Sequence, residues 1–159
     1  WTGGKLSRSN LKCLENLSVT LTPTKQVTLV HGSPRDPTWE YLFSSEAADL
    51  NFGYFTSKIA FIGHTHVPTI FKKVPDSPCQ IIHPFEISFP LAEDARYIIN
   101  VGSVGQPRDG NPDASFLIFD SDKLIIEYHR VSYHVAETQE KMRNADLPRF
   151  LVERLAYGA

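Results

Sequence analysis

Cysteine is scarce in this sequence, and its scarcity excludes a disulfide-stapled secreted scaffold. The 159 residues include two cysteines, Cys13 and Cys79, which lie in unrelated contexts and form no CxxC motif. Small secreted domains rely on a dense framework of paired cysteines, and CxxC pairs are typical of zinc and redox sites. We therefore expect both thiols to be free and the protein to be cytoplasmic.

Long apolar runs and clusters of basic residues are also absent. The longest apolar runs, such as residues 59–62 and 116–119, are far shorter than the roughly 20 residues that cross a bilayer. Lysine and arginine together number 16 against 18 acidic residues, which gives a formal net charge of -2. Because binding to a phosphate backbone requires clustered positive charge, the sequence predicts no membrane partner and no general nucleic-acid partner.

Methionine is almost missing as well. The first residue is Trp1, and the one methionine is Met142. An ordinary translation product begins with methionine, so we expect either a processed precursor or, as the motifs below favour, a fragment of a longer reading frame. A composition of 42% hydrophobic and 21% charged residues is typical of a globular domain or part of one.

Two short apolar segments each end at histidine. Residues 27–30 and 58–62 have the apolar, β-branched pattern of buried strands. The first stops at His31, within a turn of glycine and proline, and the second is followed by Gly63, His64, Thr65 and His66. Sites in open α/β sheets collect at the carboxyl ends of strands, so we expect the three histidines to meet at one edge of a sheet.

Imidazole is the commonest neutral metal ligand in proteins. Two histidines separated by one residue can share a metal ion or serve two ions about 3.5–4 Å apart, the spacing of two-metal hydrolases. We expect Gly63 to let the backbone turn without a Cβ clash before His64. The HxH pattern alone leaves open a second interpretation, in which these are loop histidines without a ligand role.

The other predicted elements follow from hydrophobic periodicity and from the residues that typically begin or end helices and strands. A helix capped by Ser7 or Ser9 carries leucines at 11, 14 and 17. We expect residues 69–74 to form the hairpin-like partner of the strand at 58–62. The remaining expectations are helices at 37–42, at about 45–50, at 135–144 and at 148–157, and strands at 80–83, 97–101, 114–119 and 124–131, with 75–95 the least regular stretch.

Three blocks of sequence resemble successive motifs of the calcineurin-like metallophosphoesterases, in particular their small phosphodiesterase-like branch in bacteria and archaea. The blocks are VHGSPRDPTWEYL at 30–42, IGHTHVP at 62–68 and INVGSVGQPRDGNPD at 99–113. The likeness extends over nearly the whole chain. It implies an α/β (α+β) fold, a four-layer α/β/β/α sandwich with mixed sheets, of which residues 1–159 form the C-terminal part.

The resemblance also implies a ligand set. His31 and His64 resemble the histidine ligands of the family's second metal ion, and His66 resembles the histidine of the first. The family's Asp-x-His, Gly-Asp-x-x-Asp and Gly-Asn-His-Asp motifs do not occur in this sequence. We therefore expect two divalent ions (manganese, iron, zinc or nickel) in the intact parent, and at most one weakly bound ion in this chain.

The implied activity is metal-dependent hydrolysis of phosphomonoesters or phosphodiesters, in which a metal-bridging hydroxide attacks phosphorus. We expect a small phosphate ester or nucleotide as substrate, contacted by Gly63, Thr65, Ser103 and Arg108. No catalytic residue beyond the metal ligands is expected in this chain, which alone should be inactive or nearly so. Arg108 has an alternative role, pairing with Asp109 or Asp113.

Other interpretations remain open. The chain could be a non-catalytic scaffold or binding module, or one half of a split enzyme. In either case an incomplete sandwich exposes apolar sheet surface, so we expect poor solubility or self-association. Trp39 and Tyr41 are expected to pack against the helix at 37–42. His83, His129 and His134 are expected to be surface or packing residues.

Overall fold

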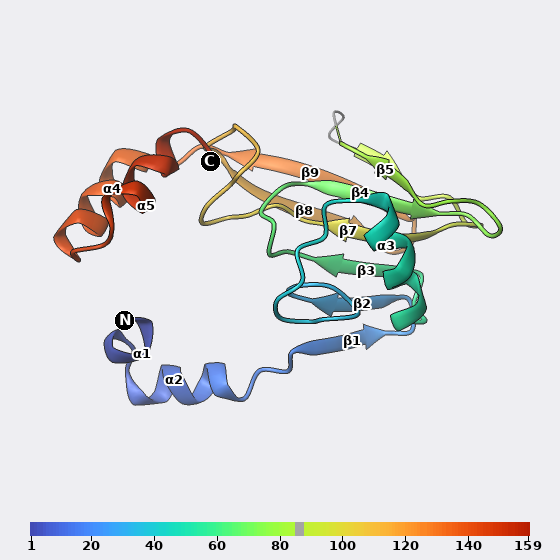
Figure 1. The fold of residues 1–159 in the computed structure, drawn as a ribbon, viewed down its shortest axis with the longest axis horizontal. Helices are drawn as coiled ribbons and strands as arrows, with labels where there is room; N and C mark the ends of the chain where they lie inside the picture. The colour runs from blue at the N-terminus through green and yellow to red at the C-terminus, as the bar shows by residue number, and fades with distance from the viewer. Residues whose placement is uncertain (85–87) are drawn as a thin grey trace.

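The computed structural model describes residues 1–84 and 88–159, which form three layers: a helix, a six-stranded mixed sheet and a three-stranded antiparallel sheet (Figure 1). This arrangement confirms the predicted α/β class with mixed sheets. The elements are α1 (Thr2–Lys5), α2 (Arg8–Glu15), β1 (Thr20–Thr24), β2 (Val27–Val30), α3 (Ser45–Asn51), η1 (Phe52–Tyr54), β3 (Ile59–Ile62), β4 (Thr69–Lys73), β5 (Gln80–Ile82), β6 (Ser88–Pro90), β7 (Arg96–Asn100), β8 (Ala114–Asp120), β9 (Ile125–Val131), α4 (Val135–Asn144), α5 (Arg149–Glu153) and η2 (Arg154–Ala156).

The large sheet has the strand order β1-β2-β3-β7-β4-β5, and its three central pairings set the position of the site. Strands β2, β3 and β7 are parallel, with Val27 opposite Ile59 and Ile59 opposite Tyr97. Their carboxyl ends therefore lie at one edge of the sheet. Strand β4 is antiparallel to β7 and begins at the same edge, because Thr69 pairs with Asn100.

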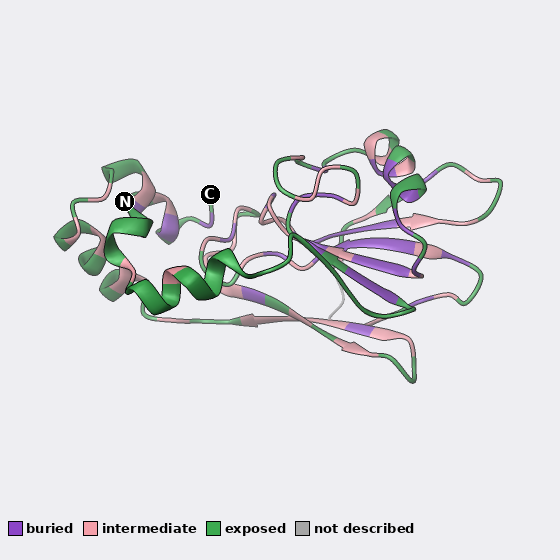
Figure 2. Ribbon diagram, turned by 90° about the horizontal axis from the view of Figure 1, so that it is seen from below, coloured by how far each residue is buried: buried purple, intermediate pink, exposed green. Residues whose placement is uncertain are grey.

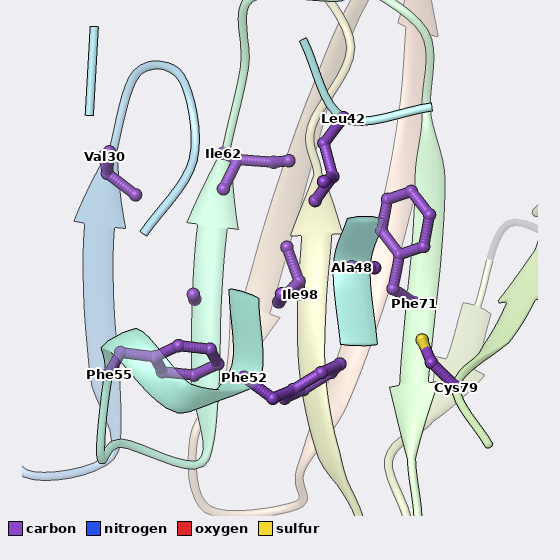
Figure 3. Close-up of a cluster of buried hydrophobic side chains, with 10 residues drawn as sticks. Val30, Leu42, Ala48, Phe52, Phe55, Ile62, Phe71, Cys79 and Ile98 are labelled. Atoms are coloured by element: carbon purple, nitrogen blue, oxygen red, sulfur yellow. The ribbon is translucent and has the colours of Figure 1, made fainter. Parts of the chain in front are cut away.

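Side chains alternate between the two faces of this sheet, as the pleat of a β-strand requires. Ala60 and Ile62 of β3 face α3 and pack in a cluster that includes Leu42, Phe52 and Phe71 (Figure 3). Ile59 of the same strand faces the small sheet instead and packs with Tyr97, Ile99 and Ile126. Strands β3 and β7 are thus buried on both faces, which explains their continuous apolar sequences.

The small sheet, of order β6-β9-β8, covers only part of the large one. Beyond it, Leu21 of β1 and Leu29 of β2 are exposed, and together with Leu17, Val19 and Phe61 they line an open cavity of about 820 Å³. Figure 2 shows the mixed exposure of this side of the molecule. Exposed apolar sheet surface was predicted from the sequence, and the self-association expected from it stays a prediction.

The predicted helix at 37–42 is wrong. Residues 37–39 form a turn, in which Asp36 Oδ1 accepts hydrogen bonds from the backbone N–H groups of Thr38 (3.1 Å) and Trp39 (3.0 Å). Gly32 N–H donates to the carbonyl of Pro37 at 2.7 Å and closes the loop. Aspartate competes with helical hydrogen bonding in this way, so the proline starts a turn and no helix follows.

Strand pairing also differs from expectation at two places. The predicted hairpin of residues 58–62 with 69–74 does not form, because β7 lies between β3 and β4. Strand β1 was not predicted, since it contains Pro23; it is an edge strand with irregular register, where proline is tolerated. Strand β6 was not predicted from the sequence either. Residues 85–87 of the irregular stretch lie outside the described residues.

The terminal helices extend beyond the sheets at the same end of the molecule (Figures 1 and 2). Helix α2 begins as predicted, with the Ser7 hydroxyl accepting a hydrogen bond from Asn10 N–H at 3.2 Å. The C-terminal segment returns to the loop at 101–113, where Gly110 N–H donates to the carbonyl of Gly158. Within the two described ranges, no helix combines the length and apolar character needed to cross a membrane.

Arg96 joins β7 to the segment that follows α3. Its guanidinium donates to the carbonyls of Phe52 (3.0 Å), Phe55 (2.5 Å) and Ser57 (3.1 Å), and it lies 4.3 Å from the centroid of the Phe55 ring. Desolvation by burial lowers the pKa of this guanidinium. One cation thus satisfies three carbonyl groups that this irregular segment would otherwise leave without donors.

We expect Arg96→Ala to lower the free energy of unfolding by about 3 kcal/mol, because three carbonyl groups lose a charged donor. Urea denaturation followed by circular dichroism measures the change. Arg149→Ala is the matched control: its side chain is 90% exposed, so a change within about 0.5 kcal/mol is expected. Equal losses in the two variants would contradict the structural role of Arg96.

Candidate metal centre

The candidate centre lies at the sheet edge where β2, β3 and β7 end. His31 follows the last residue of β2, and His64 comes two residues after β3. The loop at 101–113 follows β7 at the same edge. Parallel pairing therefore brings together segments that are 33 residues apart in the sequence.

His31 and His64 are in direct contact. His31 Nε2 lies 2.9 Å from His64 Nδ1, and the ring centroids are 4.8 Å apart. Burial, and then the proximity of His64, lower the pKa of His31. A neutral imidazole is the form that binds a metal ion.

The other ring nitrogen of His64 has no partner. His64 Nε2 is buried and makes no hydrogen bond to any residue that the structure describes. A buried polar atom without a partner is costly, so this nitrogen fits a ligand that the polypeptide does not supply. His129 Nε2 also lacks a hydrogen bond, but it lies 3.4 Å from the Glu127 carboxylate, and its ring stacks on Phe116.

His66 lies in the same loop, with its ring turned toward the loop at 101–113. Its Nδ1 is 2.6 Å from the carbonyl of Gln106, a contact that makes Nδ1 the donor and leaves Nε2 free to bind a metal. Burial lowers the pKa of His66; the bond to Gln106 opposes this, while Arg108 and then the other two histidines lower it further. The three rings thus influence one another electrostatically.

The donor set fits part of a metal centre. The histidines supply neutral nitrogen ligands, which suit zinc, iron, manganese and nickel. Across residues 1–84 and 88–159, however, no three histidine, cysteine, aspartate or glutamate side chains are close enough to form a complete site. His31 and His64 are paired, and the remaining ligand positions need groups from elsewhere.

Left-handed backbone shapes the loop that carries His64 and His66. Both residues have a φ of 62°, a conformation that costs a non-glycine residue about 1 kcal/mol or more. Gly63 was expected to avoid a Cβ clash, and this prediction is wrong. A Cβ at Gly63 would lie 3.6 Å from the carbonyl oxygen of His31, which is an ordinary contact. The strained turn falls on the histidines themselves, and such strain persists only where surrounding structure holds it.

Asn100 is the residue that holds this loop, and the sequence analysis missed it. Its buried side chain donates to the Gly63 carbonyl (2.5 Å) and to Thr65 Oγ1 (2.8 Å), and its Oδ1 accepts from Gly102 N–H (3.0 Å). Thr65 is itself buried, so its hydroxyl is used inside the loop. An asparagine that ends an apolar strand before a glycine-rich loop was the available signal.

The loop at 101–113 presents Arg108 beside His66. Arg108 N–H donates to the His66 carbonyl at 3.2 Å, and the guanidinium donates to Gln106 Oε1 at 2.9 and 3.2 Å. The alternative pairing of Arg108 with Asp109 is wrong, because Asp109 pairs with Arg130. The hydroxyl of Ser103 accepts from Gln106 N–H at 3.0 Å and so stabilises the turn.

A network around Glu40 fixes the loop after His31, and it too was missed. Glu40 accepts hydrogen bonds from Ser33 and Arg35, and from Asn51 Nδ2 at 3.1 Å. Burial alone would raise the pKa of Glu40, but these donors outweigh it and lower the pKa. Because Asn51 ends α3, the network ties the His31 loop to that helix.

Comparisons with known proteins agree with this geometry, although no protein-family model matches the chain. A crystal structure of a metallophosphoesterase from Sphaerobacter thermophilus is 43% identical and superposes with a TM-score of 0.89; the match covers 98% of this chain and 64% of that one. An uncharacterized protein of Methanocaldococcus jannaschii is 37% identical over 163 residues, covering 99% of this chain and 63% of its own length.

A hypothetical protein of Pyrococcus horikoshii shares the fold, with a TM-score of 0.73 at 16% identity over 99% of this chain and 57% of that one. The predicted resemblance is confirmed: over 98% of its length the chain is similar, at 43% identity, to a metallophosphoesterase. It spans less than two thirds of the length of these relatives.

Two glycines in the centre offer a matched test of its backbone. Gly102 has a φ of +81°, and a Cβ there would lie 2.4 Å from Ser115 Oγ, whereas Gly63 has room. We expect Gly102→Ala to lower the free energy of unfolding by about 2 kcal/mol or more, through strain and overpacking. For Gly63→Ala we expect less than about 1 kcal/mol. Thermal and urea denaturation measure both, and a larger loss for Gly63→Ala would refute the described loop.

Proposed function

We propose that this chain carries the histidine ligands of a metallophosphoesterase that hydrolyses phosphomonoesters or phosphodiesters. The contact between His31 and His64, with the unpartnered His64 Nε2, is the observation that carries the proposal. Similarity to a metallophosphoesterase at 43% identity supports the same reaction class.

In this proposal His31, His64 and His66 hold divalent cations. A bound cation polarises the phosphoryl oxygens and makes a water nucleophile available near neutral pH. The lowered pKa values of His31 and His66 keep these rings in the neutral, metal-binding form. None of the three serves as the general acid, because their nitrogens are needed for the metal.

Arg108 is the proposed phosphate contact. Gln106 orients its guanidinium, and the backbone of Arg108 is bonded to that of His66. A guanidinium held in this way suits the oxygens of a phosphate better than a flexible ammonium group. Ser103 supports the turn that positions Gln106. Gly63 precedes His64, and Thr65 lies between His64 and His66.

The carboxylate ligands of a two-metal centre are proposed to lie outside residues 1–159. The paired imidazoles of His31 and His64, without an adjacent carboxylate, can hold one ion weakly, so two ions require the rest of the centre. Manganese, iron, zinc and nickel all suit a mixed set of histidine and carboxylate ligands. Residues 1–159 are accordingly proposed to correspond to part of the domain that the longer relatives contain.

The open cavity over β1 and β2 favours a second candidate function. Its apolar lining, which includes Leu21, Leu29 and Phe61, continues the face that the small sheet covers elsewhere. If a separate polypeptide covers this face, the protein is one half of a split enzyme. Co-purification of such a polypeptide with the tagged chain at fixed stoichiometry would favour this candidate.

We expect His31→Ala and His64→Ala each to weaken cobalt binding by about tenfold or more, because each removes a direct ligand. A titration followed by visible absorption measures the affinity. His129→Ala and His134→Ala are the controls, and neither should change it. Equal losses in all four variants, or no cobalt binding by the wild-type chain, would contradict the assigned ligands.

Activity gives a separate test. With added manganese and a nitrophenyl phosphate ester, we expect turnover by a longer version that includes the aspartate motifs, and little or none by residues 1–159. The physical reason is the absence of carboxylate ligands near the three histidines. Full activity from residues 1–159 alone would show that the remaining ligands need not come from outside.

A further inference from the structure

The loop at 101–113 is contacted by the last residues of the chain. Figure 1 shows the C-terminal end beside this loop, which joins β7 to β8. The carbonyl of Gly158 accepts a hydrogen bond from Gly110 N–H at 2.9 Å. Gly158 is buried between two exposed residues, Tyr157 and Ala159. Residues 157–159, here called the strap, are therefore fixed against the loop.

Two independent features require glycine at position 158. The φ of Gly158 is +63°, in the left-handed region that a residue with a Cβ rarely adopts. A Cβ there would also lie 2.5 Å from the carbonyl carbon of Asn111 and 2.7 Å from its backbone nitrogen. Both neighbours are backbone atoms, so no side-chain rotation relieves the overlap. Gly158→Ala must therefore displace either the strap or the loop.

The strap is itself held by η2. Tyr157 N–H and Ala159 N–H donate to the carbonyl of Arg154 at 3.1 and 3.3 Å, and the Arg154 guanidinium donates to the main-chain oxygen of Ala159. Gln139 of α4 donates to the carbonyl of Val152 in α5 at 2.8 Å. The strap is thus the end of a folded helical unit made of α4, α5 and η2.

Two hydrogen bonds connect the loop to the candidate centre. Two residues before Gly110, Arg108 N–H donates to the His66 carbonyl at 3.2 Å. Two residues further back, the carbonyl of Gln106 lies 2.6 Å from His66 Nδ1. The Gln106 side chain also orients the Arg108 guanidinium. A displacement at Gly110 therefore reaches both His66 and Arg108 through a short stretch of backbone.

An ion pair holds the same loop from the small sheet. Arg130 of β9 pairs with Asp109 and donates to the carbonyl of Asp113 at 3.1 Å. These contacts fix residues 109 and 113 but not the turn between them. The strap contacts that turn, at Gly110 and Asn111. The two supports are therefore complementary.

We propose that Gly158 is a positioning residue, through which the strap holds the turn at 110–112 so that His66 and Arg108 keep their places in the candidate centre. This inference rests on the proposed function for the roles of His66 as a metal ligand and Arg108 as a phosphate contact. Groups of a binding or catalytic site must be held within about 0.5 Å of the productive geometry, so a backbone overlap at the loop is enough to disturb them. The helical unit thereby acquires a role at the centre.

Nuclear magnetic resonance of the metal-free chain tests the proposal. Long-range proton–nitrogen spectra at about pH 8, where imidazole is neutral, report which ring nitrogen of each histidine carries the proton. In the wild type we expect the His66 proton on Nδ1, as the bond to Gln106 requires. In Gly158→Ala the Nδ1 and Nε2 signals of His66 should move toward each other as this bond weakens, while those of His129 stay in place.

Amide exchange gives a second readout from the same samples. Because Gly158→Ala displaces the acceptor of Gly110 N–H, we expect exchange at Gly110 to become about tenfold faster or more. Val101 N–H, which donates to the Ile62 carbonyl at 3.1 Å, reports the sheet edge. Its exchange should change much less, which separates displacement of the loop from a loss of global stability.

Gly105→Ala is the matched control. Gly105 lies in the same loop, directly before Gln106, and its φ is outside the left-handed region. A Cβ at Gly105 would meet open space. We therefore expect Gly105→Ala to keep the wild-type His66 signals and the wild-type exchange at Gly110.

Two further variants of the strap keep the test decisive. Asparagine tolerates a positive φ better than alanine, but its Cβ meets the same backbone atoms of Asn111, so Gly158→Asn should displace the loop as well. A chain ended at Tyr157 removes the contact and adds no overlap. It should show the same change at His66, and it replaces Gly158→Ala as the test if that variant does not fold.

Unchanged His66 signals in both Gly158→Ala and the chain ended at Tyr157 overturn the positioning role. Equal acceleration of exchange at Gly110 and Val101 also overturns it, because Gly158 then supports the fold alone. Wild-type signals in Gly158→Asn would show that the overlap with Asn111 is not what fixes the loop, and they overturn the proposal too. Since no metal ion takes part, these outcomes leave the proposed phosphoesterase standing; that proposal fails separately, if the wild-type chain binds no cobalt.

Discussion

The parallel pairing of β2, β3 and β7 is the constraint on which the candidate centre depends. Its register places Val30, Ile62 and Asn100 at one sheet edge, so the residues that follow these strands converge there. The contact between His31 and His64 is a consequence of this pairing. For β3 and β7 the pairing is in turn maintained by burial on both faces, against α3 on one side and the small sheet on the other.

Polar side chains then turn this edge into a shaped site. Asn100 holds the loop in which His64 and His66 adopt left-handed backbone, and Glu40 fixes the loop that follows His31. Both are satisfied by several hydrogen bonds, as buried polar groups must be. The histidine rings are thus held by neighbouring polar side chains, which is the support that the proposed metal site needs.

The sequence predicted the strands that end at histidine, helices where the structure has 8–15, 45–51 and 135–144, and the resemblance to metallophosphoesterases, because periodicity and short motifs are local signals. It failed at the turn of residues 37–39, where the side chain of the neighbouring Asp36 binds the backbone N–H groups. It also failed at the position of β7 between β3 and β4, which is set by long-range pairing. The roles of Asn100 and Glu40 depend in part on Gly63 and Asn51, which lie 37 and 11 residues away from them.

X-ray absorption at the zinc edge tests the central claim most directly, since it reports the ligands of the bound ion. For the chain loaded with one equivalent of zinc, the account predicts nitrogen ligation with the scattering pattern of at least two imidazoles. The same spectrum from His64→Ala should lose one of them. An oxygen-only shell in the wild-type chain, or an unchanged spectrum in the variant, would contradict the assignment of this sheet edge as the metal centre.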